Sequence, residues 1–222
     1  MKPNLNKMTK GQILELFNYK CTHGHNGLSH YNCYMREEKK EERVGCLDIE
    51  ASNLKANFGI ILSWAIKPLH EEEIYYDVIT KKDLETGRMD ASVVGTLLDT
   101  IDDHFDRVVT WYGTKFDIPY IRSRALYHGL DHYKFGEVLH TDAYYMARSK
   151  LCIHSNRQGV VGGFLSGEDI KTKIDFEHWL KALTGNEKSL AYILDHNLAD
   201  VQQLEDNYLK LRDFVKINNR SA

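Results

Sequence analysis

Two acidic residues inside one apolar run constrain this chain most strongly. The run Val44–Ala51 reads Val-Gly-Cys-Leu-Asp-Ile-Glu-Ala, so Asp48 and Glu50 interrupt a segment that otherwise has the composition of a buried strand. Successive side chains of a strand point to opposite faces, so both carboxylates project to the same side. Two ionised carboxylates on one apolar face repel each other and lose hydration. A divalent cation is the simplest compensation, and oxygen ligands suit Mg²⁺ or Mn²⁺.

Two further aspartates are placed to complete such a site. Asp117 lies in the segment Trp-Tyr-Gly-Thr-Lys-Phe-Asp-Ile-Pro, which ends at Pro119, and Asp200 follows His196 by four residues. Residues four apart on a helix are neighbours, so His196 and Asp200 are expected on one strip of a late helix. Four carboxylates that share divalent cations indicate a nuclease.

Composition sets broad limits on the protein. With 222 residues, of which 42% are hydrophobic, the chain is long enough for one sizeable core with a small appendage. The net charge of −3 gives no global basic field, so nucleic acid must be held by local patches and metal ions. The four cysteines show no disulfide framework, and no apolar leader or membrane span is found. We therefore expect a soluble, cytoplasmic protein with no membrane partner.

Residue patterns predict an α/β fold with a mixed central sheet flanked by helices. A capping box at Thr9 and Gln12 opens the first helix, and residues 35–43 read as a solvated connector. Two parts are expected: residues 1–42, with one helix and a His/Cys-rich loop, and residues 43–222, with the sheet. The expected strands are about 44–50, 58–66, 74–79, 107–111 and 137–141; the expected helices are about 11–19, 91–105, 118–127, 143–151, a stretch near 179, and 188–214.

The order of the acidic motifs resembles a known family. Asp-Ile-Glu at 48–50, Phe-Asp-Ile-Pro at 116–119 and His-Asn-Leu-Ala-Asp at 196–200 resemble the three Exo motifs of the DEDD 3′–5′ exonucleases. These enzymes belong to the ribonuclease H-like superfamily. The resemblance covers roughly residues 43–212 and is greatest to the predicted ribonuclease H-like exonuclease group, which is related to the proofreading domains of family B DNA polymerases. It implies a ribonuclease H-like fold and two bound metal ions.

The resemblance also implies a role for each acid. Asp48 would bridge both metal ions, and Glu50 would bind one ion and contact the attacking water. Asp117 would act largely through water, and Asp200 would hold the catalytic ion. The expected activity is metal-dependent 3′–5′ exonucleolytic hydrolysis at single-stranded 3′ ends of DNA or RNA, with two Mg²⁺ or Mn²⁺ ions. The alternatives are an endonuclease or RNase H-type activity on duplexes, and an inactive nucleic-acid-binding module. A polymerase or a replication or repair protein stays open as a partner.

The general base departs from the family pattern. The family usually has Tyr four residues before the last Asp, or His five residues before it, whereas this chain has His196 four residues before Asp200. Asp195 lies directly before His196 in the sequence. An imidazole with an ordinary pKa near 6.5 can accept a proton at neutral pH. We therefore take His196 as the candidate base.

The segment between residues 21 and 33 concentrates metal-binding side chains. Tetrahedral Zn²⁺ takes four nitrogen or sulfur ligands, and Cys21, His23 or His25, His30 and Cys33 can supply them. The spacing is not that of a standard zinc finger. Two other interpretations stay open: a metal-free loop docked on the nuclease body, and imidazoles that contact substrate phosphates.

Basic and aromatic residues between the third motif and the last suggest where substrate lies. Lys171 and Lys173 are the preferred phosphate contacts, in a glycine-containing segment that reads as partly flexible. Tyr144 and Tyr145 can stack on unpaired bases, while Trp179 is expected mainly in the core. Asp142, which follows a threonine, is expected to cap the next helix rather than to bind metal.

Overall fold

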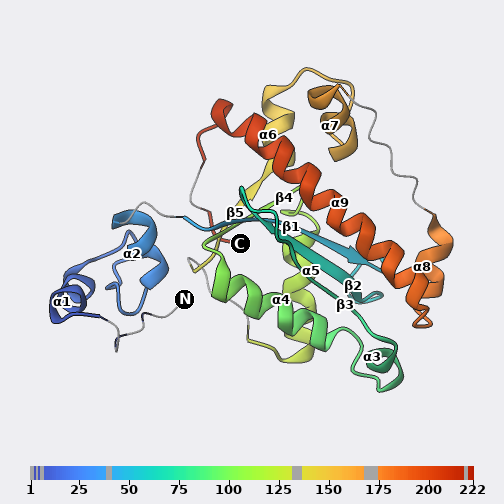
Figure 1. The fold of residues 1–222 in the computed structure, drawn as a ribbon, viewed down its shortest axis with the longest axis horizontal. Helices are drawn as coiled ribbons and strands as arrows, with labels where there is room; N and C mark the ends of the chain where they lie inside the picture. The colour runs from blue at the N-terminus through green and yellow to red at the C-terminus, as the bar shows by residue number, and fades with distance from the viewer. Residues whose placement is uncertain are drawn as a thin grey trace.

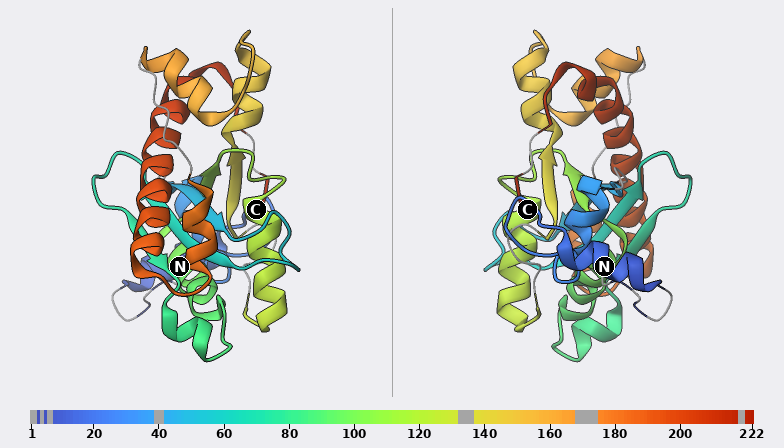
Figure 2. Two further views of the ribbon diagram at one scale, coloured as in Figure 1. Left: turned by 90° about the vertical axis from the view of Figure 1, so that its right-hand side faces the viewer. Right: turned by 90° about the vertical axis from the view of Figure 1, so that its left-hand side faces the viewer.

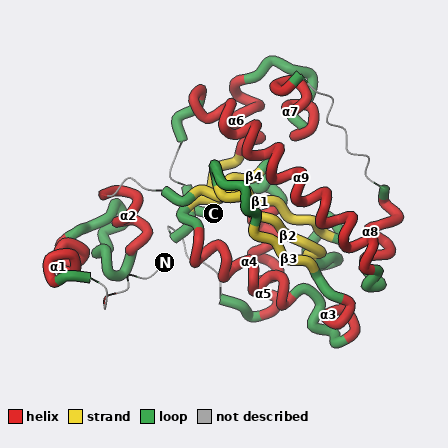
Figure 3. The backbone as a smooth tube through the Cα atoms, viewed as in Figure 1, coloured by secondary structure: helices red, strands yellow, loops and turns green. Residues whose placement is uncertain are grey.

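The computed structural model describes residues 3, 5, 8–38, 42–131, 137–167, 175–217 and 220–222. These residues form a five-stranded sheet with the strand order β3-β2-β1-β4-β5, which confirms the mixed α/β fold (Figures 1 and 3). β1 pairs antiparallel with β2 and parallel with β4, β2 pairs antiparallel with β3, and β4 pairs parallel with β5. The strands are β1 (Val44–Ala51), β2 (Ile61–Pro68), β3 (Tyr75–Val78), β4 (Arg107–Thr110) and β5 (Leu139–Asp142).

Helices cover both faces of the sheet. Figure 2 shows α9 on one side of the strands and α5 on the other. The helices are α1 (Lys10–Asn18), α2 (Tyr31–Glu38), α3 (Lys81–Glu85), α4 (Ala91–His104), α5 (Asp117–His128), α6 (Ala143–Lys150), α7 (Gln158–Ser166), α8 (Phe176–Ala182) and α9 (Glu187–Leu211), followed by a 3₁₀ turn (Arg212–Phe214). Among the described residues, no helix combines the length and the apolar character that crossing a bilayer requires.

The central strand β1 separates two hydrophobic clusters. Leu47 and Ile49 belong to a cluster with buried residues of α4 and α5, whereas Cys46 belongs to a cluster with buried residues of α6 and α9. Because side chains alternate along a strand, Asp48 and Glu50 point to the same face as Cys46. The acidic pair therefore faces α9, the helix that carries Asp200.

A buried ion-pair network holds α5 against the sheet. Arg124 of α5 donates to Asp90 from Nε (2.9 Å) and Nη2 (2.5 Å), and His128 Nε2 lies 2.7 Å from the same carboxylate. Asp90 also accepts the backbone N–H of Ile61 at the start of β2 (2.8 Å). Burial alone would raise the pKa of Asp90, but these hydrogen bonds and the guanidinium charge lower it below its ordinary value. The network fixes the helix whose first residue is Asp117.

α1 and α2 lie together at one end of the molecule, to the left of the sheet in Figure 1. The capping box that opens α1 is confirmed: Thr9 Oγ1 accepts from Gln12 N, and Gln12 Oε1 accepts from Thr9 N. Among the described residues of this end, the buried hydrophobic ones are Leu16, Cys21, Cys33 and Tyr34. They belong to neither hydrophobic cluster of the sheet.

The structure corrects several expected elements. Residues 31–38 form a helix, whereas the sequence predicted loop and connector there, because Cys33 and Tyr34 are buried while strong helix formers such as Glu complete the segment. The segment expected to be partly flexible contains α7, in which Gly162 is buried and close to the Gln203 side chain of α9. The short helix α3 was not predicted. β2 begins at Ile61 rather than 58, because Ile60 instead exchanges hydrogen bonds with Ser52.

The Asp90 network gives a stability prediction. Asp90→Ala should lower the free energy of unfolding by about 3–5 kcal/mol, because Arg124 stays buried after losing its carboxylate partner. Chemical denaturation followed by circular dichroism measures this change. Glu85→Ala is the matched control, because it breaks an ion pair with Lys81 in which both side chains are exposed, and a change below about 1 kcal/mol is expected. Equal, small effects of the two substitutions would contradict the assigned role of the buried network.

Candidate metal centre

Three carboxylates from two distant segments meet beside the sheet. Asp48 and Glu50 of β1 and Asp200 of α9 each offer an oxygen, and these oxygens lie within 4.8 Å of one another. All three side chains are partly buried. Side chains alternate along β1, so Asp48 and Glu50 point to one face of the sheet. α9 packs across the same face and places Asp200 beside them.

Asp117 lies beside this group as the first residue of α5. Its side chain is buried, and Oδ1 accepts the backbone N–H of Ile49 between the two acids of β1 (3.3 Å). Its charge raises the pKa of both Asp48 and Glu50. Asp117 is therefore next to the three-carboxylate group without being one of its members.

The pKa values of all four acids are raised, chiefly by burial, and the charges of neighbouring acids add to the effect at Asp48 and Glu50. Burial, followed by the charges of Asp200 and Asp117, raises the pKa of Glu50 to about 8. Burial raises the pKa of Asp117 to about 7, although its backbone hydrogen bonds act to lower this pKa. Burial also raises the pKa of Asp200 to about 6. The pKa of Asp48 is raised well above its ordinary value by burial and then by the other three acids. A bound cation would relieve this repulsion.

Asn197 is part of the site and was not among the residues predicted from the sequence. Its Nδ2 donates to Asp48 Oδ2 (2.6 Å), and its Oδ1 accepts from Ser63 Oγ of β2 (3.3 Å). Asn197 is buried, on the part of α9 that faces the sheet. This hydrogen bond lowers the pKa of Asp48 and holds its carboxylate in place. The sequence held one indication of this role: Asn197 is a polar residue in the buried stripe of a helix, and it directly follows the candidate base His196.

His196 lies on the same helix, within an aromatic cluster. Its ring stacks edge-on against Tyr192 (centroids 4.6 Å apart) and lies 6.2 Å from the ring of Trp179 on α8. The pKa of His196 lies below its ordinary value. Burial lowers it most and His178 lowers it further, while the charge of Asp195 acts in the opposite direction. His196 is therefore neutral, and able to accept a proton, at neutral pH. The grouping of potential metal ligands contains Asp200 but not His196.

Asp142 organises the loop that leads to Asp117. Its carboxylate accepts the backbone N–H groups of Tyr112 (2.9 Å), Thr114 (2.9 Å) and Tyr144 (3.1 Å). The last bond confirms that Asp142 caps α6. Tyr112 adopts the left-handed backbone conformation (φ 68°), which is uncommon for a residue with a Cβ, and the two loop hydrogen bonds support it. Asp142 is thus a structural acid at the edge of the metal centre.

The expected substrate contacts have mixed outcomes. Trp179 packs against the main hydrophobic cluster, as expected for a core residue. Three other basic residues between the second and last acidic motifs, Arg148, Lys150 and Arg157, are exposed along the end of α6 and the loop that follows. Gln158 Nε2 donates to the backbone carbonyl of Asp200 (2.7 Å), so this loop returns to the metal centre. Lys171 and Lys173 lie outside the described residues.

The His/Cys segment gathers a second group of potential ligands, far from the acids in the sequence. One atom from each of Cys21, His23, His30 and Cys33 lies within 4.8 Å of the others. His25 is not in this group, and its ring packs against that of His30 at an interplanar angle of 42°, with centroids 4.0 Å apart.

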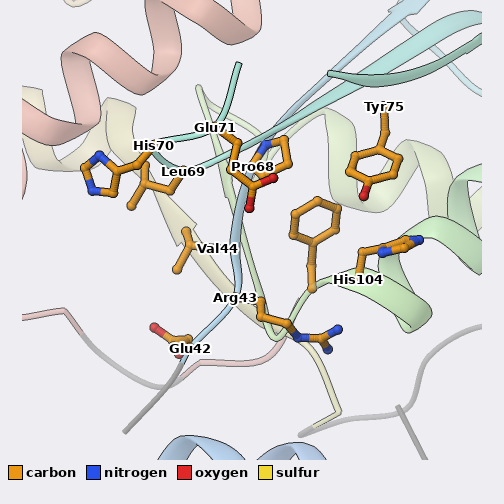
Figure 4. Close-up of a pocket in the computed structure, with 10 residues that line it drawn as sticks. Glu42, Arg43, Val44, Pro68, Leu69, His70, Glu71, Tyr75 and His104 are labelled. Atoms are coloured by element: carbon orange, nitrogen blue, oxygen red, sulfur yellow. The ribbon is translucent and has the colours of Figure 1, made fainter. Parts of the chain in front are cut away.

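A separate cavity lies at the opposite end of β1 from the acids. It encloses about 350 Å³ beside Arg43 and Val44, and its wall includes Tyr75 stacked on His104 (Figure 4). It contains none of the acidic motif residues, so the cavity and the metal centre are distinct features.

The raised carboxylate pKa values predict how stability depends on pH. Acids in the unfolded chain ionise near pH 4, whereas Asp200, Asp117 and Glu50 hold protons up to about pH 6, 7 and 8. Between these values the folded protein binds more protons than the unfolded chain, so its free energy of unfolding should fall as pH rises. Thermal unfolding in a chelating buffer at several pH values measures this slope.

Added Mn²⁺ and the isosteric variant Asp48→Asn are the controls for this dependence of stability on pH. Added Mn²⁺ should raise the melting temperature more at pH 8 than at pH 5.5, because the cation competes with protons for the acids. Asp48→Asn removes one charge and should flatten the slope in chelator. A slope that is identical in the variant would show that these acids do not control it.

A model of the RNase_H superfamily matches residues 45–211. Among solved structures, the family B DNA polymerase from the hyperthermophilic archaeon Pyrobaculum calidifontis is similar, with a TM-score of 0.64 and 17% identity. That alignment covers 78% of this chain and 25% of the polymerase chain, and at this identity it supports the fold alone. A comparison with curated protein sequences finds no match. The family match covers the sheet and every acid of the cluster, and this chain belongs to the RNase_H superfamily.

Proposed function

We propose that this protein is a metal-dependent nuclease that removes nucleotides from the 3′ ends of single strands. The observation that carries the proposal is the convergence of Asp48, Glu50 and Asp200, with Asp117 beside them. Three carboxylates within 4.8 Å of one another, with Asp117 beside them and all four pKa values raised by burial, form an unfavourable group without a cation. Membership of the RNase_H superfamily and similarity to a DNA polymerase support nucleic acid as the substrate.

The donor set fits hard divalent cations. All the available ligand atoms are carboxylate oxygens, which Mg²⁺ and Mn²⁺ prefer. Asp48, Glu50 and Asp200 would hold the ions directly, and Asp117 would contribute through water. When bound, a pair of such ions supplies Lewis-acid stabilisation of both the attacking and the leaving oxygen of a phosphodiester.

The chain's own residues supply positioning and proton transfer. Asn197 fixes the Asp48 carboxylate, and Ser63 fixes Asn197 in turn. His196, neutral because its pKa is lowered, would accept the proton of the attacking water. Its stacking against Tyr192 restricts the imidazole orientation. A neutral imidazole held in one orientation beside the carboxylates is suited to hydrolysis at neutral pH.

Exposed aromatic side chains near the metal centre favour a single-stranded substrate. Tyr112, Tyr144 and Tyr145 have ring centroids 4.8 to 6.4 Å apart, and Tyr112 and Tyr145 are 44% and 38% exposed. Asp142 holds the loop of Tyr112 and caps the helix of Tyr144, so the cluster is built on the segment that delivers Asp117. Unpaired bases stack on such surfaces, whereas paired bases present only their edges.

Substrate assays test the activity against its alternatives. The purified chain would be incubated with Mn²⁺ or Mg²⁺ and end-labelled single- and double-stranded DNA and RNA. Stepwise loss of 3′ mononucleotides from single strands is expected. Internal cuts in duplexes or RNA–DNA hybrids would indicate the endonuclease or RNase H-type alternative. Binding without hydrolysis under every metal condition would indicate an inactive binding module and contradict the proposal.

The metal ligands give the strongest mutational prediction. Asp48→Asn and Asp200→Asn should each lower the hydrolysis rate on the order of 10³-fold or more, because the rate depends on ions held between these acids. The folded state should persist, since each change removes repulsion between acids. Asp206→Asn, an exposed change on the same helix, is the matched control and should keep the wild-type rate. Near-normal activity in either ligand variant would refute the site.

The general base gives a prediction on pH dependence. His196→Ala should reduce the rate on the order of 10²–10⁴-fold. In the wild type, activity should rise with pH through the lowered pKa of His196 and then level off. Asp195→Asn removes the charge that raises this pKa, so it should move the rising limb to lower pH and preserve the plateau. An unchanged pH profile in both variants would exclude His196 as the base.

A further inference from the structure

We propose that Cys21, His23, His30 and Cys33 form a closed tetrahedral zinc site that stabilises the N-terminal unit, residues 8–38. Both histidines would bind through Nδ1, and both cysteines as thiolates. This site is separate from the acidic metal centre, and its purpose is structural. The inference does not depend on the proposed nuclease activity.

The distances between the four side chains match tetrahedral zinc. Zn–S and Zn–N bonds of about 2.3 and 2.0–2.1 Å at tetrahedral angles place sulfur and nitrogen about 3.6 Å apart. Sγ of Cys21 lies 3.8 Å from His23 Nδ1 and 3.7 Å from His30 Nδ1. Sγ of Cys33 lies 3.7 Å from each of the same two nitrogens. All four sulfur–nitrogen separations are therefore within about 0.2 Å of the value for a shared zinc ion.

Hydrogen bonds alone do not explain this arrangement. A ring nitrogen carries either one hydrogen or one lone pair, so it makes one conventional hydrogen bond. Each Nδ1 here approaches two sulfurs equally closely, which gives four contacts for two nitrogens. A single ion at the centre accounts for all four contacts at once. Two thiolates and two imidazoles with no open position are typical of structural zinc.

The local backbone selects His23 rather than His25. A turn at Gly24, which has a left-handed φ of 81°, reverses the chain between the two histidines. The N–H of Gly24 bonds to the carbonyl of Cys21 (2.8 Å), and the N–H of Cys21 bonds to the carbonyl of His25 (2.9 Å). His23 thereby reaches both sulfurs, while the His25 ring lies tilted against the His30 ring.

The rest of the unit is built around the ligand loop. Tyr19 at the end of α1 donates to Glu37 of α2, and Tyr34 of α2 donates to Glu15 of α1. The two tyrosine rings meet edge-on, 5.3 Å apart. These reciprocal contacts join α1 and α2 on either side of the loop. Cys33 lies in the first turns of α2, so the proposed ion also ties this helix to the loop.

The small size of the N-terminal core explains why a metal would be needed. Leu16 and Tyr34 are buried here, but the remaining buried hydrophobic residues of the unit are the two cysteine ligands themselves. A unit of about 30 residues with so little apolar burial needs a metal or another cross-link to fold stably. We infer that zinc binding and folding of residues 8–38 are coupled.

Metal analysis of the full chain tests the site. The protein would be purified in reducing buffer without a metal-affinity column, and zinc measured by mass spectrometry. About one zinc per chain that resists mild chelation is expected. Replacement by Co²⁺ should give the visible absorption of a tetrahedral ion together with thiolate-to-metal charge transfer. Absence of both zinc and this Co²⁺ spectrum would overturn the proposal, as would a Cys21–Cys33 disulfide under these conditions.

Matched histidine variants make the assignment specific. His23→Ala and Cys33→Ser should reduce bound zinc to near zero and expose residues 8–38 to proteolysis, leaving a resistant fragment that contains the sheet. His25→Ala removes an imidazole from the same loop and should retain zinc at the wild-type level. Equal zinc loss in His23→Ala and His25→Ala would overturn the ligand set. Wild-type zinc content in Cys33→Ser would do the same.

Discussion

The structure depends on holding like charges together at the centre of its sheet. Asp48 and Glu50 lie on the middle strand, and α9 places Asp200 against them while Asp117 closes in from α5. Ionised carboxylates in such a setting oppose folding, as their raised pKa values express. Hydrophobic packing on both faces of the sheet and the buried Asp90–Arg124 pair must outweigh this repulsion. The fold thus holds a group of acids whose mutual repulsion must be offset by bound protons or cations.

Much of this centre could be predicted from local rules, since those rules are strong here. The two-residue strand period placed Asp48 and Glu50 on one face, and the order of motifs identified Asp117 and Asp200. Asn197 was missed because its role depends on a contact with Asp48 across 149 residues, which no local pattern encodes. The helix α7 was missed because its glycines lower intrinsic helix propensity, while packing against α9 supplies the stability.

The His/Cys segment shows a different limit of sequence reasoning. Residue types alone identified a zinc-like set but left His23 and His25 equivalent, since both lie at short spacing from Cys21. The choice between them depends on one backbone turn at Gly24 and on the contact of the His25 ring with His30. The helix at residues 31–38 could not be predicted from the sequence either, because it depends on the burial of Cys33 and Tyr34 in the folded protein.

The two candidate metal sites differ in the chemistry that each ion must provide. The acidic centre offers only oxygen ligands and keeps its acids partly accessible, which suits weakly held, exchangeable Mg²⁺ or Mn²⁺ and a substrate phosphate. The N-terminal set offers sulfur and nitrogen in a closed arrangement, which suits a tightly held ion with no free position. If both sites bind as proposed, ligand softness would direct different metals to different ends of one chain. A chelator of moderate affinity should accordingly empty the acidic centre first, because only the thiolate–imidazole set is built for retention.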